Sequence, residues 1–315
     1  MSEDPSRHLG LDLGATNVKW TVLEHDAGEW RVLDRGHDAT PTTAPEAVLA
    51  RLVEVGRTAL SDWPGVGSLG IGVPGLYDAE SGAARFLPNL PGDWSGRPVA
   101  GPIGTALGLP AFLINDARAF GLAELRMGAG RGCATMAGLT LGSGVGGVVV
   151  VDGRVHFGHD GTGGEVGHQT IEADGPPCTC GNRGCLEALT RADRIAAACG
   201  TQTAEQAVEA ARAGDERAVG GLARIGGYLG IGIANLIVLL TPDRVVIGGG
   251  VSAAGDLLLE PIRAEVRRRV HVTDLDRVEI VAAELGTWAG AIGAAVYGAE
   301  RRRAPQAAAT GAGAA

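Results

Sequence analysis

Residues 8–23 read HLGLDLGATNVKWTVL, and this stretch decides the fold. Two apolar, β-prone runs flank the polar turn Gly14-Ala15-Thr16-Asn17, which predicts a β-hairpin. About 125 residues later, the runs 135–141 and 148–151 flank a second glycine-rich turn. The repeated arrangement of strand, glycine turn and strand predicts a duplicated α/β unit.

Beyond the hairpins, the apolar patterning alternates between helix and strand spacing, which is typical of α/β proteins. The segments with helical spacing are 45–60, 103–107, 116–126, 218–240, 257–269 and 288–297. The further segments predicted as strands are 31–38, 67–73, 111–114, 244–247 and 278–282. The stretch 74–104 is rich in glycine and proline but contains Phe86 and Trp94, so we interpret it as an ordered loop.

The length of 315 residues predicts two domains of ordinary size. We expect a small α/β domain over 1–114, a large α/β domain over 115–287, and a helix over about 288–303 that packs back on the small domain. The alanine-rich end, 304–315, is expected to be a disordered tail. Glycine accounts for 52 residues, but hydrophobic residues at 45% and charged residues at 20% argue against disorder elsewhere.

The charge balance argues against nucleic acid as a partner. There are 36 acidic and 27 basic residues, a net charge of −9, so nothing favours contact with a phosphate backbone. The first residues do not form a secretory signal, and we find no apolar run of the length that a membrane span requires. We therefore expect a cytoplasmic protein without a membrane partner.

Both glycine turns carry groups that bind phosphate. The first is preceded by Asp12 and contains Thr16, and the second reads Thr140-Leu-Gly142-Ser143-Gly144. Glycine lets backbone N–H groups approach an anion closely, and hydroxyl groups add further donors. One such turn is explained by the needs of a hairpin, whereas two together favour phosphate binding.

A dinucleotide site is the weaker interpretation. Residues 142–147 fit the pattern G-x-G-x-x-G, but a valine-rich strand follows them where the pattern requires a helix. Residues 248–253 match the pattern better, because they lie between a predicted strand and a predicted helix. However, no acidic residue ends a second strand about 20 residues later, as a dinucleotide fold requires. A P-loop motif is absent.

Three of the five cysteines lie in the stretch Cys178-Thr-Cys180-Gly-Asn-Arg-Gly-Cys185, with His168 upstream. Three thiolates and one imidazole form a common closed tetrahedral zinc shell, and local ligands on a glycine-turned loop suit a structural site. The sequence therefore predicts a structural Zn²⁺ bound by His168, Cys178, Cys180 and Cys185. The remaining cysteines, Cys133 and Cys199, are expected to be ordinary buried residues.

Six motifs occur in a fixed order along the chain: Asp12-x-Gly14-x-Thr16, Asn115-Asp116, Gly142-Ser143-Gly144, Gly164-Glu165-Val-Gly167-His168, the cysteine stretch followed by Glu187, and Gly248-Gly249-Gly250. Together they resemble the ROK family of sugar kinases and sugar-responsive repressors, over about residues 9–297. The resemblance implies the two-domain actin-like ATPase fold of hexokinases, with an interdomain cleft.

The resemblance also implies which residues carry the chemistry. Asp116 would be the catalytic base that faces the sugar hydroxyl, and its place at a helix N-terminus predicts that the helix dipole keeps its carboxylate ionised. Asp12 would hold Mg²⁺ through water. The implied ATP-binding residues are Asp12, Gly14, Ala15, Thr16, Asn17, Thr140, Gly142, Ser143, Gly144, Gly249 and Gly250.

The sugar ligands implied by the resemblance are Asn89, Asn115, Asp116, Glu165, His168 and Glu187. His168 would use one ring nitrogen for zinc and the other for sugar, so the metal would position a sugar ligand. The chain departs from the family at Ala15, where glycine is frequent, and at Arg118, where many family kinases carry a second asparagine. The direction of the Arg118 side chain does not follow from the sequence.

We therefore expect an ATP-dependent, glucokinase-like enzyme that phosphorylates a neutral hexose at its 6-hydroxyl, as a homodimer or homotetramer. Glucose is the expected sugar, ahead of mannose, fructose, N-acetylmannosamine and N-acetylglucosamine. A sugar-sensing regulator is opposed by the acidic charge and by a first strand that begins near residue 8. A zinc-containing dinucleotide enzyme is opposed by the failed fingerprints. An inactive sugar-binding protein is disfavoured because Asp12, Asp116 and both glycine turns are present.

Overall fold

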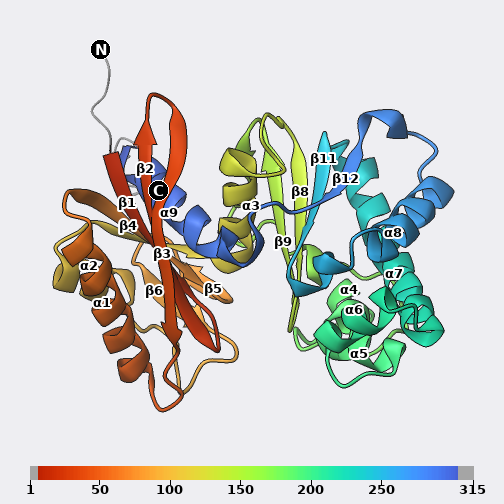
Figure 1. The fold of residues 1–315 in the computed structure, drawn as a ribbon, viewed down its shortest axis with the longest axis horizontal. Helices are drawn as coiled ribbons and strands as arrows, with labels where there is room; N and C mark the ends of the chain where they lie inside the picture. Colours follow the sequence, from red (N-terminus) through yellow and green to blue (C-terminus); the bar gives the residue numbers. More distant parts are fainter. Residues whose placement is uncertain (1–5, 304–315) are drawn as a thin grey trace, which may run out of the picture. The chain divides into compact units, whose positions relative to one another are not determined.

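The computed structural model describes residues 6–303, which form two compact units (Figure 1). The first unit runs to Ile114 and resumes at Ala294, and the second unit is Asn115–Gly293. The helix expected over about 288–303 is α9 (Ala289–Arg303), and it is divided between the two units. The tail expected over 304–315 lies outside the described residues.

The sheet of the first unit has the strand order β3-β2-β1-β4-β7. Its strands are β1 (Ser6–Leu13), β2 (Asn17–Asp26), β3 (Glu29–Ala39), β4 (Val66–Val73) and β7 (Ala111–Asn115). β1 pairs antiparallel with β2 and parallel with β4, so the predicted hairpin is confirmed. The centre of β4 is buried, which explains its continuous apolar sequence without alternation.

Two helices of the first unit, α1 (Pro45–Asp62) and α2 (Ala100–Leu107), belong to its core. α1 buries Val48, Leu52, Val55 and Ala59, which recur at helical spacing on one face. The second half of α9 packs closely on β4, where a Cβ on Gly70 would overlap the carbonyl group of Ala294. Glycine in the middle of this strand therefore permits a close approach of two backbones.

The stretch 74–104 is ordered, as predicted, but it contains a hairpin that we did not expect. β5 (Leu76–Asp78) and β6 (Ala83–Phe86) pair antiparallel, and α2 begins three residues before the predicted helix. Strands this short show no alternation from which they could be predicted. Trp94 is 3% exposed and belongs to the core of the first unit, which explains the order of the remaining loop.

The second unit repeats the strand arrangement of the first, in the order β10-β9-β8-β11-β12. Its strands are β8 (Met136–Leu141), β9 (Val145–Val151), β10 (Arg154–Val155), β11 (Arg244–Gly248) and β12 (Glu279–Ala282). β8 pairs antiparallel with β9 and parallel with β11, as β1 does with β2 and β4. The predicted duplication of an α/β unit is confirmed.

The helices of the second unit are α3 (Asp116–Met127), α4 (Leu186–Thr190), α5 (Ala192–Cys199), α6 (Ala204–Arg212), α7 (Glu216–Leu240), α8 (Asp256–Arg269) and the start of α9. Its 3₁₀ turns are η1 (Val166–His168), η2 (Gly250–Ala254), η3 (Leu275–Arg277) and η4 (Gly286–Trp288). α7 is long and apolar enough to cross a membrane, but 56% of its apolar 18-residue stretch is buried inside the protein. It is the central helix of this core and packs against α8.

Candidate active site and metal centre

The predicted base lies at the first position of α3, directly after β7. Asn115 is the N-cap, and its Oδ1 accepts hydrogen bonds from the backbone N–H groups of Ala117 at 3.1 Å and Arg118 at 3.2 Å. Asp116 begins the helix, and its Oδ1 accepts from the N–H of Ala117 at 2.8 Å. The predicted cap at Asn115-Asp116 is thus confirmed, and it fixes the Asp116 carboxylate at the end of a buried strand.

The electrostatic environment of Asp116 differs from the sequence-based expectation. Desolvation of the half-buried carboxyl group raises its pKa from 3.8 to about 6, although the Ala117 N–H opposes this shift. The negative charge of Glu165 raises the same pKa further, and the positive charge of Arg118 lowers it. We expected the helix N-terminus to keep this carboxylate ionised, and burial opposes that effect by raising the pKa. Asp116 is ionised near pH 7 and has a pKa suited to a general base.

Arg118 points from α3 toward the segment that carries Glu165. Its Nε donates to the carbonyl oxygen of Gly163 at 3.0 Å, and its Nη2 donates to Oε1 of Glu165 at 2.9 Å. The sequence left this direction open. A basic group therefore does accompany the predicted sugar carboxylate, as an ion pair between residues 47 positions apart.

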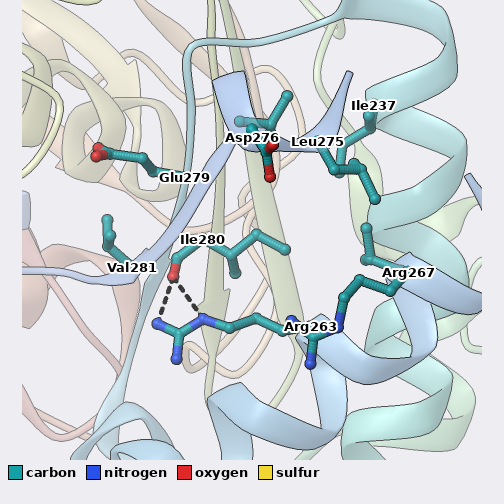
Figure 2. A pocket seen from close by; sticks show the side chains of 10 residues that line it. Ile237, Arg263, Arg267, Leu275, Asp276, Glu279, Ile280 and Val281 are labelled. Atoms are coloured by element: carbon teal, nitrogen blue, oxygen red, sulfur yellow. Dashed lines mark hydrogen bonds between the residues drawn. The ribbon is translucent and has the colours of Figure 1, made fainter. Parts of the chain in front are cut away.

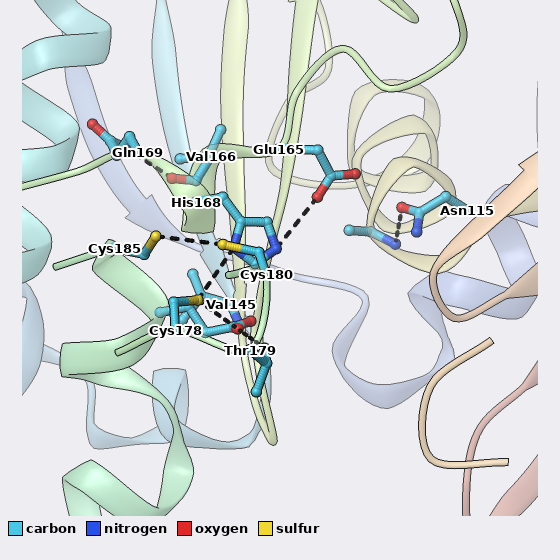
Figure 3. Close-up of polar contacts among 12 residues, drawn as sticks. Asn115, Val145, Glu165, Val166, His168, Gln169, Cys178, Thr179, Cys180 and Cys185 are labelled. Atoms are coloured by element: carbon cyan, nitrogen blue, oxygen red, sulfur yellow. Dashed lines mark hydrogen bonds and ion pairs between the residues drawn. The ribbon is translucent and has the colours of Figure 1, made fainter. Parts of the chain in front are cut away.

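The four predicted zinc ligands lie together, as Figure 3 shows. Their donor atoms are all within 4.8 Å of one another, with Sγ of Cys180 3.7 Å from Sγ of Cys185 and Sγ of Cys178 3.6 Å from Nδ1 of His168. In a tetrahedral shell with Zn–S bonds of about 2.3 Å and Zn–N bonds of about 2.0–2.1 Å, two sulfur atoms lie about 3.8 Å apart and sulfur and nitrogen about 3.6 Å. The donor set and its spacing fit a closed zinc site.

A glycine-turned loop brings these ligands together. The N–H of Cys178 donates to the carbonyl oxygen of Asn182, and the N–H of Gly181 donates back to that of Cys178. Gly184 has a φ of +65°, and a Cβ there would overlap the carbonyl group of Glu172. L side chains rarely adopt this conformation, which explains why a glycine stands at position 184 of the cysteine stretch.

His168 lies between the cysteines and Glu165 (Figure 3). Its Nδ1 faces Sγ of Cys178, while its Nε2 lies 4.0 Å from Oε2 of Glu165. The other predicted sugar carboxylate, Glu187, accepts a hydrogen bond from the N–H of Val145 at 2.9 Å through its Oε2. Its Oε1 lies 3.8 Å from Sγ of Cys178. Glu187 therefore links the second glycine turn to the candidate metal centre, a contact that the sequence did not indicate.

The second glycine turn connects β8 and β9 as predicted. Within it, the N–H of Gly142 donates to the carbonyl oxygen of Gly144 at 3.0 Å, and Ser143 lies exposed between them. Gly249, with a φ of +86°, packs so closely on Leu141 at the end of β8 that a Cβ would overlap it. The structure thus brings Gly249 and Gly250 beside the turn formed by Gly142, Ser143 and Gly144.

The first glycine turn belongs to the other unit. The N–H of Gly14 donates to the carbonyl oxygen of Asn17 at 3.0 Å, and Ala15 and Thr16 are exposed at its tip. Thr40 stabilises the turn, because its Oγ1 donates to the carbonyl oxygen of Gly14 at 2.7 Å and its N–H donates to that of Thr16 at 2.9 Å. Sequence reasoning missed Thr40, which follows β3 and carries no motif.

The predicted site residues divide between the two units. The first unit holds Asp12 at the end of β1, the turn 14–17, and Asn89, which is exposed and has a φ of +64°. The second unit holds Asn115, Asp116, Thr140, Glu165, His168 and Glu187 together with the cysteines, Gly142–Gly144, Gly249 and Gly250. Asparagine tolerates the left-handed conformation better than most residues, which suits position 89.

A separate cavity of about 330 Å³ lies beside the edge strand β12 (Figure 2). Its walls come from α7, α8 and η3, and Arg263 closes one side by donating to the carbonyl oxygen of Ile280 through Nε at 3.2 Å and Nη2 at 2.7 Å. The described residues that line it include none of the predicted site residues. Three of its charged groups form ion pairs with residues outside the lining, Glu279 with Arg244 and both Arg263 and Arg267 with Glu260. We assign no chemistry to this cavity.

Comparison with known proteins identifies the family. The ROK family model matches residues 8–300. The glucokinase of Thermotoga maritima is 36% identical over 91% of this chain and 95% of its own length. Among solved structures, the ROK hexokinase of Thermus thermophilus is 34% identical with a TM-score of 0.79, covering 94% of this chain and 99% of that chain.

A glucokinase from Streptomyces griseus, solved in complex with glucose and AMPPNP, is 31% identical with a TM-score of 0.80, covering 94% of this chain and all of that one. These likenesses confirm the predicted class, a two-domain α/β fold of the actin-like ATPase type. The chain belongs to the ROK family.

Proposed function

We propose that the protein is an ATP-dependent glucokinase, which transfers the γ-phosphate of ATP to the 6-hydroxyl of glucose. The observation that carries this proposal is the similarity to glucokinases over nearly their whole length. The second unit supports it independently, because a carboxylate with a raised pKa lies on the same unit as hydroxyl-binding groups and a glycine turn. A cytoplasmic role in carbohydrate metabolism, at the entry of glucose into glycolysis, follows from this activity.

Asp116 serves as the general base in this proposal. It accepts the proton of the 6-hydroxyl as that oxygen attacks the γ-phosphorus, and the bond from phosphorus to the β–γ bridging oxygen of ATP breaks. The Ala117 N–H holds the carboxylate at the start of α3. Because its pKa is about 6, the carboxylate is largely ionised at neutral pH and still basic enough to accept a proton.

The sugar contacts come from groups that accept or donate hydrogen bonds without carrying a net positive charge. Glu165 and Glu187 offer carboxylate oxygens to hydroxyl donors, His168 offers Nε2, and Asn89 and Asn115 offer amide groups. The Arg118 charge is already neutralised by Glu165. A neutral hexose therefore suits this set better than a sugar acid or a sugar phosphate.

The two glycine turns bind the nucleotide in this proposal. Asp12, Gly14, Ala15, Thr16 and Asn17 form the part that faces the β- and γ-phosphates. Thr140, Gly142, Ser143 and Gly144 complete the phosphate contacts, with Gly249 and Gly250 near the adenosine. Asp12 would hold Mg²⁺ through water, and the ion supplies neutralisation of phosphate charge when it is bound.

The metal centre has a structural role in this proposal. His168, Cys178, Cys180 and Cys185 hold zinc, and the fit of their donor atoms supports this assignment. When bound, the ion would fix the orientation of the imidazole, and Nε2 of His168 would carry the hydrogen and point toward Glu165. Zinc therefore positions a sugar ligand and takes no part in phosphate transfer.

The experiment measures ADP release from ATP with glucose, mannose, fructose, N-acetylmannosamine and N-acetylglucosamine in turn. We expect the highest kcat/KM with glucose. A higher kcat/KM with an N-acetylhexosamine would support the kinase activity but change the assigned sugar. Binding of sugar without any ADP release would contradict the proposal that the protein is an enzyme.

A sugar-responsive regulator is the second candidate. The structure of a ROK transcriptional regulator is 29% identical with a TM-score of 0.81, over 92% of this chain and 77% of that chain. The assay above separates the two functions, because a regulator would bind sugar without turnover. We further propose a homodimer or homotetramer, which sedimentation equilibrium would test.

A further inference from the structure

Arg118 is the most deeply buried charged side chain close to the predicted base. Its side chain is 1% exposed, whereas the Glu165 side chain with which it pairs is 39% exposed. A buried guanidinium group is costly unless its charge is neutralised and its N–H groups are bonded. The pair is therefore asymmetric, with a fixed cation inside the protein and a carboxylate that reaches the surface.

The contacts of Arg118 hold the backbone around Glu165 as well as its side chain. Nε binds the carbonyl oxygen of Gly163 and Nη2 binds Oε1 of Glu165, so one planar group contacts both sides of Gly164. This segment also lies directly on β9, where a Cβ on Gly167 would overlap the carbonyl group of Val145. The segment is thus held by contacts with both α3 and β9.

The ion pair also determines which carboxylate oxygen remains for a ligand. Oε1 of Glu165 is engaged by Arg118, and Oε2 is the oxygen that lies 4.0 Å from Nε2 of His168. A hydroxyl group between these two atoms could donate to Oε2 and accept from the imidazole N–H. If the carboxylate rotated about its last bond, this pairing would be lost.

We propose that Arg118 is a positioning residue for the sugar: it fixes the Glu165 carboxylate so that Oε2 and His168 together receive one hydroxyl group of the hexose. The proposal deepens the proposed function and rests on it in one respect, that Glu165 contacts the sugar. Arg118 itself touches neither sugar nor nucleotide. It therefore sets the affinity for sugar and has little effect on the affinity for ATP.

A lysine at position 118 would make only part of the contacts that Arg118 makes. It would keep the positive charge, but its single ammonium group lacks the planar fork that reaches the Gly163 carbonyl and the Glu165 carboxylate together. Methionine would fill similar space without charge. The two substitutions therefore separate the geometry of the contact from its charge.

The test compares Arg118→Lys and Arg118→Met with the wild type, and Arg126→Met is the matched control. Arg126 lies on the same helix, and its Nη1 donates to the carbonyl oxygen of Gly153, away from Glu165. Each protein is assayed for the KM of glucose and of ATP and for kcat. The Kd of glucose is measured by calorimetry without nucleotide, and circular dichroism checks the fold.

We expect Arg118→Met to raise the KM and Kd of glucose about tenfold or more, the loss typical of a hydrogen bond to a charged group. The KM of ATP should change less than about twofold, with Arg118→Lys intermediate and Arg126→Met unchanged. If Arg118→Met does not fold, the change in the KM of glucose relative to the change in the KM of ATP is measured in Arg118→Lys instead.

Three outcomes of these measurements have different meanings. A wild-type protein that binds glucose but transfers no phosphate overturns the proposed function alone, because the effect on glucose Kd is still measurable. An unchanged glucose Kd in folded Arg118→Lys and Arg118→Met, or equal changes in the KM of glucose and ATP, overturns the positioning role. Failure of the wild type to bind any hexose of the panel overturns both.

Discussion

The two sheets have the same strand order, but different groups hold their glycine turns. In the first unit, neutral groups stabilise the turn, namely its own backbone and the hydroxyl and N–H of Thr40. In the second unit, the N–H of Val145 donates to the carboxylate of Glu187, which also lies beside Cys178. The duplicated fold therefore provides two similar turns, and only the second is connected to a candidate metal centre.

A second difference between the units is that the predicted base and the candidate metal ligands all belong to the second unit. α3 begins the second unit with a half-buried Asp116, and the segment after β10 adds Glu165, His168 and the cysteines. Among the described residues, His168, Cys178, Cys180 and Cys185 are the only group of three or more His, Cys, Asp or Glu side chains placed to hold a metal. A repeated fold thus carries chemistry that is not repeated.

The largest expected effect is on the base. Asp116→Asn should lower kcat by about 10²- to 10⁴-fold and change the Kd of glucose much less, because only the proton acceptor is lost. Asp256→Asn is the matched control, since Asp256 is the first residue of α8 in the same unit but is 79% exposed. Turnover above a tenth of the wild-type rate in Asp116→Asn would show that the base lies elsewhere.

The next effect concerns the metal centre. Cys180→Ser should remove one zinc per chain and lower the Tm, because a structural metal contributes folding free energy. Metal analysis of protein purified without chelators measures the zinc content, and calorimetry measures the Tm. Cys199→Ser, in the core of the same unit, should keep its zinc. Equal zinc content in the two variants would exclude Cys180 as a ligand.

The dependence of activity on pH should follow Asp116. A base must be ionised to accept a proton, and burial raises the pKa of this carboxyl group to about 6. The value of kcat/KM should therefore be constant above about pH 7 and fall about tenfold per pH unit well below 6. A constant rate down to pH 4.5 would indicate a base with an ordinary pKa or none at all.

The smallest effects compare the two turns directly. Thr40→Val removes one hydrogen bond from the first turn and should raise the KM of ATP about two- to tenfold without changing the KM of glucose. Glu187→Gln should raise both, because Glu187 contacts the second turn and belongs to the proposed sugar set. An effect of Glu187→Gln on ATP alone would remove it from the sugar site.

Features that depend on neighbouring residues could be predicted from the sequence. The hairpins follow from apolar runs on both sides of a glycine turn, and the cap at Asn115 follows from its place before a helix. The grouping of His168 with Cys178, Cys180 and Cys185 could be predicted because three of the four lie within one short loop. In each case the residues that cooperate are close together in the chain.

Features that depend on residues far apart in the chain could not be predicted from the sequence. The pair between Arg118 and Glu165 joins residues 47 positions apart, and no spacing in the sequence gives the direction of a side chain. The pKa of Asp116 depends on how much of the protein surrounds it, which opposes the effect of the helix dipole that the sequence does reveal. The contact between Glu187 and Val145 likewise exists only once β9 and α4 are in place.

The central claim is that this chain phosphorylates glucose at O6 with Asp116 as the base. The most direct measurement follows glucose and ATP by ³¹P and ¹H NMR in parallel reactions with the wild type and Asp116→Asn. We predict glucose 6-phosphate and ADP in equal amounts with the wild type, and almost none with the variant over the same time. Phosphate at another position, ADP without a sugar phosphate, or equal product from both proteins would contradict the claim.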